Sequence, residues 1–253
     1  MNENEKVEIF VPYLEKFETD HMKQYCADMI KLIPDYIFDM PSSTSGKYHN
    51  ATQCQPHGQI YHIIMFASIM NYRLNLECNK DKFKSPEQRD AMRCVPIFHD
   101  AIKCGWNGSK FTVHEHPMLA GEWVRNTVVE HDIDQKVKEA IARMCERHSG
   151  EWTTSTRSNT VLPKPENAME VFIHECDILS SRSDIDMQIP DYLKAIFDQV
   201  TPQQLPDINT YQLTFGKWAG RTLVEVNELA PDYIAWAKDN ITKEPVRSLL
   251  KQL

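Results

Sequence analysis

The sequence lacks most of the short motifs that mark common enzyme classes. Its eight glycines among 253 residues are about half the usual ~7% share, which disfavours a glycine-rich nucleotide loop and a turn-rich all-β fold. The segment Ser43-Thr44-Ser45-Gly46-Lys47 does not have the G-x-x-x-x-G-K-[ST] spacing of a P-loop. Neither G-x-S-x-G nor H-E-x-x-H occurs, which argues against a common serine hydrolase or a zincin.

Features of secreted and membrane proteins are also missing. The seven cysteines are an odd number and none lies in a C-x-x-C pair, so neither a disulfide framework nor a thiolate zinc site is predicted. No apolar run approaches the ~18 residues that span a bilayer. The start, Met1-Asn2-Glu3-Asn4-Glu5, has neither the basic nor the apolar region of a signal peptide. We therefore expect a cytoplasmic protein with no membrane partner.

The charge balance is acidic, with 28 Lys and Arg against 36 Asp and Glu and a formal net charge of −8. This balance disfavours a protein that wraps nucleic acid through a broad basic surface. Residues 201–253 carry six basic and six acidic side chains, so the whole excess lies in the first 200 residues. The length suits one large domain, or one domain with a small appendage.

Hydrophobic periodicity predicts a mostly helical chain. From Ile133 to Cys145 the apolar residues recur at the spacing of one buried helical face. Asp132 or Asp134 can cap the start of this helix, and Gly150 suits its end. Ser85-Pro86-Glu87-Gln88 is typical of a helix start with proline at the first helical position. Further helices are expected over residues 57–76, 115–128, 165–181 and 190–199, and a loop over 41–54.

A domain boundary is expected at residues 201–207, a polar stretch with two prolines and no periodicity. After it, residues 211–215 alternate like a short strand, and residues 216–220 are predicted to form a turn. Short helices are expected over residues 223–229, 231–239 and 244–253. The prediction is thus an all-α main domain at residues 1–200, followed by a small α+β module at residues 207–253.

Histidine is the residue that points to chemistry, because imidazole is the commonest metal ligand. Eight of the ten histidines lie between residues 57 and 174. The adjacent pair His99-Asp100 offers one imidazole and one carboxylate to neighbouring metal positions, and a carboxylate can bridge two ions. Lys103 follows His99 by one helical turn on the same predicted face, so its ammonium could meet a bound phosphate. An isolated His-Asp dipeptide often arises by chance.

The order of residues around this pair resembles that of the HD-domain metal-dependent phosphohydrolases, which have a helix-borne His, then His-Asp, further His and a late Asp. The matching residues are His62, His99, Asp100, His116, His148 and Asp177. The upstream loop Ser42–His49 also resembles a stretch of phage and prokaryotic members of that superfamily. The resemblance covers about residues 35–185, and the ordered set is specific although no single element is.

The resemblance implies an HD-domain helical bundle that hydrolyses phosphate esters of nucleotides, either nucleoside monophosphates or triphosphates. Two divalent ions are expected, and mixed imidazole and carboxylate ligands suit Mn, Fe, Co, Ni or Zn better than Mg or Ca. The first ion would be held by His62, His99, Asp100 and Asp177, and the second by His116 and His148. Water acidified by the ions would supply the hydroxide that attacks phosphorus.

The same resemblance and side-chain chemistry suggest the remaining roles. Asp100 and Lys103 are the expected catalytic residues, with the lysine neutralising phosphate oxygens. Arg147 is an alternative phosphate ligand, although an arginine at a helix end is more often solvated. The residues expected to bind substrate are Ser45, Lys47, His174 and Trp152, the last by stacking on a nucleobase.

Other interpretations stay open at this point. Each histidine taken singly could be a core residue bonded to backbone, since buried polar groups are normally hydrogen-bonded; the ordered set favours a metal site. The enzyme could instead be a phosphodiesterase or nuclease that acts on cyclic dinucleotides or oligonucleotide ends. The chain could also be a non-catalytic regulator that binds nucleotide or nucleic acid, although such a protein need not retain every ligand.

Residues 211–239 resemble the small C-terminal module of exodeoxyribonuclease X-like proteins, in the elements Phe215-Gly216-Lys217, Gly220-Arg221-Thr222-Leu223 and Pro231-Asp232-Tyr233 with Trp236. Such a module could contact nucleic acid through Lys217, Trp218 and Arg221, or it could be a packing or homo-oligomerisation unit. The acidic net charge counts against extended nucleic-acid wrapping. Bound divalent ions would nevertheless dominate the charge of a pocket and admit a nucleotide.

Overall fold

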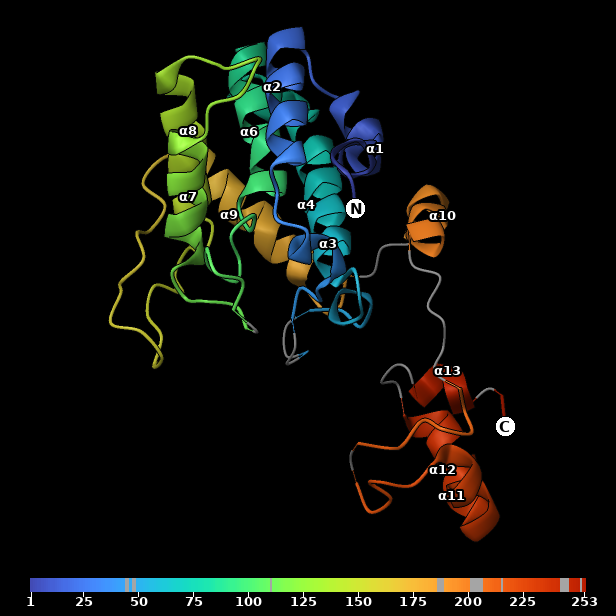
Figure 1. Ribbon diagram of the computed structural model, residues 1–253. Helices are drawn as coiled ribbons and strands as arrows, with labels where there is room; N and C mark the ends of the chain where they lie inside the picture. Colours follow the sequence, from blue (N-terminus) through green and yellow to red (C-terminus); the bar gives the residue numbers. More distant parts are fainter. Residues whose placement is uncertain are drawn as a thin grey trace. The chain divides into compact units, whose positions relative to one another are not determined.

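The computed structural model describes residues 1–43, 46, 49–109, 111–185, 189–200, 207–214, 216–241, 246–250 and 252–253. Contacts divide the chain into two compact units, Met1–Phe197 and Asp198–Leu253. Helices dominate both units (Figure 1), which confirms the prediction of a mainly helical chain. Over the described residues, none of the helices combines the length and the apolar composition that crossing a bilayer requires.

The helices of the first unit occur close to where periodicity predicts them, and others are added at its start. In chain order they are α1 (Glu3–Leu14), α2 (Asp20–Lys31), α3 (Tyr36–Asp39), the 3-10 helix η1 (Thr52–Cys54), α4 (Gly58–Leu74), α5 (Glu77–Lys80), α6 (Pro86–Phe98), α7 (His116–Asn126), α8 (Gln135–Glu146), α9 (Ala168–Ser181) and the start of α10 (Asp191–Val200). The helices predicted near residues 57–76, 115–128, 165–181 and 190–199 correspond to α4, α7, α9 and α10.

Two helices end earlier than the sequence suggests. α6 ends at Phe98, so His99 and Lys103 lie in the turns that follow it and not on one helical face. Those turns form because Ala101 N–H bonds to the Phe98 carbonyl and Lys103 N–H to the Asp100 carbonyl, both three residues back, which is the 3-10 pattern. α8 is capped by Asp134 and ends at Glu146, so the predicted extension of the helix toward Gly150 is wrong.

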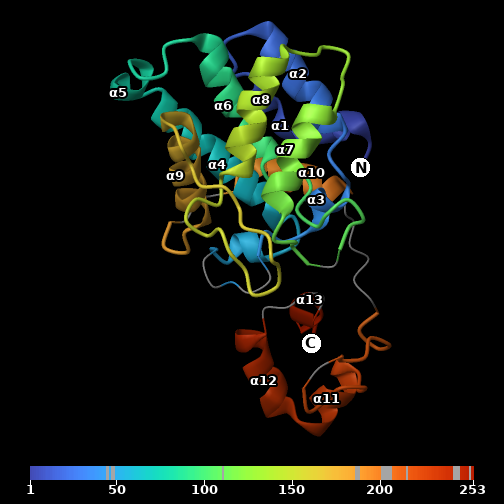
Figure 2. The same cartoon turned by 90° about the vertical axis from the view of Figure 1, so that its left-hand side faces the viewer.

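α6 is the central helix of the first unit. It packs against α2, α4, α8 and α9, and Figures 1 and 2 show it among these helices. Met92, Val95 and Phe98 on α6 are fully buried, as are Ile63 and Phe66 on α4. Burying each such side chain contributes about 1.5–3 kcal/mol. The end of α6, where His99 and Asp100 follow, is therefore anchored in the core.

α1 and α2, which were not predicted, are tied to α6 through Asp90. This carboxylate is fully buried and accepts hydrogen bonds from the backbone N–H groups of Glu18 at 3.0 Å and Thr19 at 2.8 Å. Arg93 lies 2.8 Å from the same carboxylate. A buried charge needs such partners, so the link between α1 and α2 is held against the central helix.

One end of the first unit collects segments that are far apart in the sequence. The loops before α4, after α6 and after α8 lie together at this end in both views (Figures 1 and 2). α4 begins here and α9 ends here, so both helices adjoin the same loops. This convergence places the predicted ligands within reach of one another.

The second unit has its own small core. It contains α11 (Leu223–Leu229), α12 (Pro231–Asn240) and α13 (Val246–Leu250), and Thr222 and Glu225 form a capping box at the start of α11. The predicted strand at residues 211–215 is reduced, over the described residues, to one bridge between Gln212 and Thr222. The predicted boundary residues 201–206 and Phe215 lie outside the described residues.

Candidate metal centre

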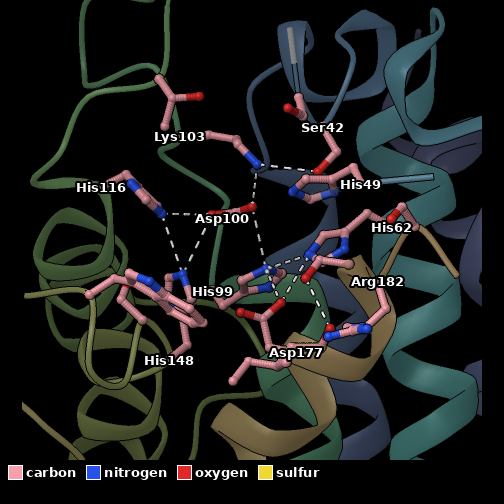
Figure 3. A pocket seen from close by; sticks show the side chains of 17 residues that line it. Ser42, His49, His62, His99, Asp100, Lys103, His116, His148, Asp177 and Arg182 are labelled. Carbon is pink, nitrogen blue, oxygen red and sulfur yellow. Dashed lines mark hydrogen bonds and ion pairs between the residues drawn. The ribbon is translucent and has the colours of Figure 1, made fainter. Parts of the chain in front are cut away.

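The six predicted metal ligands surround one pocket of about 730 Å³, a volume within the ~300–1,000 Å³ of small-ligand sites. They point toward one another in Figure 3. α4 supplies His62, α9 supplies Asp177, and His116 is the first residue of α7. The turns after α6 and α8 supply the others, which are His99, Asp100 and His148.

One pair of imidazoles lies beside Asp177. Nε2 of His62 is 3.2 Å from Nε2 of His99 and 3.2 Å from Oδ1 of Asp177. Nε2 of His99 is in turn 3.3 Å from Oδ2 of Asp100. The two imidazoles thus lie between the carboxylates of Asp177 and Asp100, and these four residues are the ones expected to hold the first ion.

A second pair of imidazoles lies on the other side of Asp100. Nε2 of His116 is 3.3 Å from Nε2 of His148, and the two nitrogens are 3.1 and 3.9 Å from Oδ1 of Asp100. This oxygen is buried and accepts no hydrogen bond from the described residues. Asp100 therefore offers one oxygen to each pair, which is the geometry of a bridging ligand.

Hydrogen bonds on the outer side of each ring fix where its hydrogen lies. Nδ1 of His99, His116 and His148 is 2.9, 2.7 and 2.7 Å from a backbone carbonyl three residues earlier. A carbonyl only accepts, so in the neutral ring Nδ1 carries the hydrogen and Nε2 carries a lone pair. Ser180 Oγ donates to the carbonyl of Asp177 at 2.7 Å, so it accepts from Nδ1 of His62 at 3.2 Å.

Four Nε2 lone pairs and two carboxylates therefore converge, and a cation is the partner that this donor set suits. Lone pairs at 3.2 and 3.3 Å repel each other when no hydrogen lies between them. Nδ1 bonded to a carbonyl is also the usual outer contact of a metal-ligating histidine. The groups that can hold an ion are His62 with His99 and Asp100, and Asp100 with His116 and His148.

Burial and charge set the protonation states of these groups. Burial raises the pKa of Asp100, but the Lys103 ammonium and the neighbouring histidines hold it well below its ordinary value. Burial also lowers the pKa of His148 to about 3. At neutral pH Asp100 is then ionised and His148 neutral, which are the states in which carboxylates and imidazoles bind metal.

Lys103, a predicted catalytic residue, is buried at the edge of the same pocket. Its ammonium lies 2.7 Å from Oδ2 of Asp100 and donates to Oε1 of Gln59 at 2.7 Å. Gln59 uses its amide N–H to bond the same Asp100 oxygen at 3.0 Å. Lys103 and Gln59 thus orient the carboxylate of Asp100, and the ammonium also lies 3.5 Å from Oγ of Ser42.

The predicted substrate-binding residues have different positions. Trp152 lies on the pocket wall and is 56% exposed. His174 is absent from the pocket lining; its Nδ1 is 2.7 Å from the carbonyl oxygen of His148 and its Nε2 is 2.9 Å from Glu151. It thereby ties α9 to the turn that carries His148. Ser45 and Lys47 lie outside the described residues.

The turn after α8 depends on Gly150. Its φ is 60°, and a Cβ at this position would lie 2.0 Å from the ring of His174, so only glycine fits. Arg147, the alternative phosphate ligand, pairs instead with Glu166 and Glu170 at 3.3 and 3.4 Å. The turn therefore presents its histidine to the pocket and directs its arginine to acidic partners.

Two residues of the site were not predicted. His49 lines the pocket beside His62, with ring centroids 5.5 Å apart, and its Nδ1 is 2.8 Å from Oε1 of Gln53. Its loop has no periodicity, so no local pattern indicates where the side chain points. Gln59, in contrast, precedes His62 by one turn on a mostly apolar helix. A polar residue one turn before a predicted ligand, on an otherwise apolar helix, could have indicated from the sequence that Gln59 belongs to the site.

Replacing Gln59 with leucine is expected to lower metal affinity about 10- to 100-fold, the usual effect of losing a hydrogen-bonding partner of a ligand. The change keeps the side chain's approximate volume but removes its bonds to Asp100 and Lys103. Titration calorimetry with Mn²⁺ measures the effect. Gln24→Leu, on an exposed position of α2, is the control, and equal affinities for the two variants would contradict the prediction.

No family model matches the chain, and no match occurs among the curated proteins or the solved structures. The support for a function therefore comes from the positions and chemistry of the side chains.

Proposed function

We propose that this chain is a metal-dependent phosphohydrolase of the HD-domain type that acts on nucleoside mono- or triphosphates. The observation that carries the proposal is the position of Asp100, which offers one oxygen to each of two histidine pairs. Sites for two neighbouring ions are widespread among enzymes that hydrolyse phosphate esters. The order of His62, His99-Asp100 and the late Asp177 along the chain supports the same family.

Each side chain has a specific task in this proposal. The six ligands hold two ions of Mn, Fe, Co, Ni or Zn. Divalent ions, when bound, lower the pKa of water and offset the charge that develops on phosphoryl oxygens. Lys103 neutralises a further phosphoryl oxygen, and Gln59 keeps Asp100 oriented. Lys47 and Ser45 are proposed to add a cation and a hydroxyl, and Trp152 an aromatic wall.

A nucleotide panel tests the reaction. Full-length protein with Mn²⁺, Co²⁺ or Fe²⁺ is expected to release inorganic phosphate, or a polyphosphate, from at least one nucleoside mono- or triphosphate. The panel includes cyclic dinucleotides and short oligonucleotides, because a diester substrate would replace this proposal with the phosphodiesterase alternative. If no member of the panel is hydrolysed with any of the three metals, the result would contradict the proposed reaction and favour the non-catalytic alternative.

We further propose that residues 207–253 form a small exodeoxyribonuclease X-like α+β module that contacts nucleic acid. Its aromatic rings are neighbours, because the ring centroids of Trp218 and Tyr233 are 6.1 Å apart and those of Tyr233 and Trp236 are 5.6 Å apart. The Lys217 ammonium lies 5.0 Å from the Trp218 ring. Bases stack on such rings and phosphates pair with such cations.

Deleting residues 207–253 tests this second proposal. The truncated protein is expected to lose binding to single-stranded oligonucleotides while it still hydrolyses mononucleotides, because the main unit has a separate core. Fluorescence anisotropy with a labelled oligonucleotide measures the binding. Equal oligonucleotide binding by the full-length and truncated chains would show that the module is a structural appendage.

A further inference from the structure

A second, smaller pocket lies directly beside the metal centre. It has a volume of about 150 Å³ and is lined by Tyr36, Met40, Pro41, Ser42, Cys104, Gly108, Ser109, Phe111 and Thr112. Ser42 and Thr112 also line the larger pocket, so the two share a wall. We call this smaller space the side pocket.

The size and the lining of the side pocket suit one aromatic ring. An apolar cavity of about 150 Å³ is known to accept benzene, whereas a whole nucleotide needs the larger volumes typical of ligand sites. Four of the nine lining residues are apolar or sulfur-bearing, namely Met40, Pro41, Cys104 and Phe111, and Tyr36 adds an aromatic ring. The side chain of Phe111 is 54% exposed.

The side pocket also has a polar group that can recognise the edge of a ring. The hydroxyl oxygen of Tyr36 accepts a hydrogen bond from the backbone N–H of Cys104 at 3.2 Å. A hydroxyl that accepts one bond still has its own hydrogen to donate. The pocket therefore combines an apolar space with a donor for a ring nitrogen or carbonyl oxygen.

The side pocket lies close to Lys103, the residue proposed to bind the phosphate of the substrate. Ser42 lies 3.5 Å from the ammonium of Lys103, as Figure 3 shows, and Cys104 is the next residue in the chain. A ligand with its phosphate at Lys103 would thus have the side pocket as its neighbour. Gly105 and Gly108, with φ of 72° and 64°, allow the loop to turn around this space.

We propose that the side pocket is the nucleobase subsite of this enzyme, in which a pyrimidine, or one ring of a purine, stacks on Phe111 and accepts a hydrogen bond from Tyr36. This inference rests on the proposed nucleotide substrate and adds to it the location of the base. Trp152, on the wall of the metal pocket, is the rival platform.

Direct binding of nucleosides tests the subsite without any hydrolysis. Full-length protein is titrated with adenosine, guanosine, cytidine and thymidine by calorimetry. Phe111→Ala is expected to weaken the best nucleoside about 5- to 150-fold, the range that stacking on one aromatic ring contributes. Tyr36→Phe is expected to weaken it about 2- to 10-fold through loss of one hydrogen bond. The control is Trp106→Ala, which removes an exposed ring of the same loop that lines neither pocket.

Each outcome either supports or overturns the nucleobase subsite. Weaker binding by Phe111→Ala and Tyr36→Phe, with unchanged binding by Trp106→Ala, supports the subsite. Unchanged binding by both pocket variants, a loss confined to Trp152→Ala, or no nucleoside binding by the wild-type protein at millimolar concentration overturns it. Since no turnover is measured, nucleoside binding by a protein that hydrolyses no nucleotide would count against the proposed reaction and leave the subsite standing.

Discussion

Replacing Asp100 with alanine is expected to abolish metal binding at both positions and to lower nucleotide hydrolysis by about 10³-fold or more. The reason is geometric, because the two oxygens of this one side chain face different histidine pairs, at 3.3 and 3.1 Å. No other described residue approaches both pairs in this way. The measurements are steady-state kinetics on the best nucleotide and metal content after gel filtration.

The control for this prediction is Asp39→Ala, because the Asp39 side chain is 74% exposed and is not part of the pocket lining. Asp100→Asn serves as a second variant that preserves the shape of the side chain if the alanine protein folds poorly. Hydrolysis at wild-type rates by a folded Asp100 variant would remove Asp100 from the proposed mechanism.

Removing the metal ions is expected to lower the melting temperature by roughly 8–16 °C. A ligand that binds only the folded state stabilises it by about 4 kcal/mol at 1,000 times its Kd. Each kcal/mol corresponds to about 2–4 °C for a unit of 150–250 residues, and the main unit is Met1–Phe197. Without an ion, Nε2 of His62 and Nε2 of His99, 3.2 Å apart, have no cation between them.

Differential scanning calorimetry before and after chelation and gel filtration measures this change. Asp100→Ala provides the matched control, since a protein that holds no metal should melt at the same temperature with and without chelator. Identical melting temperatures for metal-loaded and chelator-treated wild-type protein would argue that the histidine cluster is a purely structural hydrogen-bonded core.

Local sequence pattern predicts most of the helices but not all of their ends. α11 spans Leu223–Leu229 as expected, because a capping residue and an apolar face lie within the same short segment. α2 was missed although Met22, Cys26 and Met29 are buried at helical spacing. The early end of α6 depends on hydrogen bonds in the turns around Asp100, which no periodicity reveals.

The candidate site was predictable as a set of residue types in order, but not as a geometry. His62 and Asp177 are separated by more than 100 residues, and only the packing of α4 against α9 brings them to 3.2 Å. The carbonyl partners of His99, His116 and His148 are local, three residues earlier, but they depend on helix ends and turns that hydrophobic periodicity does not locate. His49 and the side pocket arise from loops, whose course the sequence pattern does not determine.

Metal analysis of purified full-length protein is the measurement that tests the two-ion centre most directly. After reconstitution with Mn²⁺ and gel filtration, we predict about two ions per chain for the wild-type protein. His62→Ala and His116→Ala should each retain about one ion, because each removes a ligand from a different pair, and Asp100→Ala should retain none. Wild-type protein that holds no ion, or a His116→Ala protein that still holds two, would contradict the bridged two-ion centre.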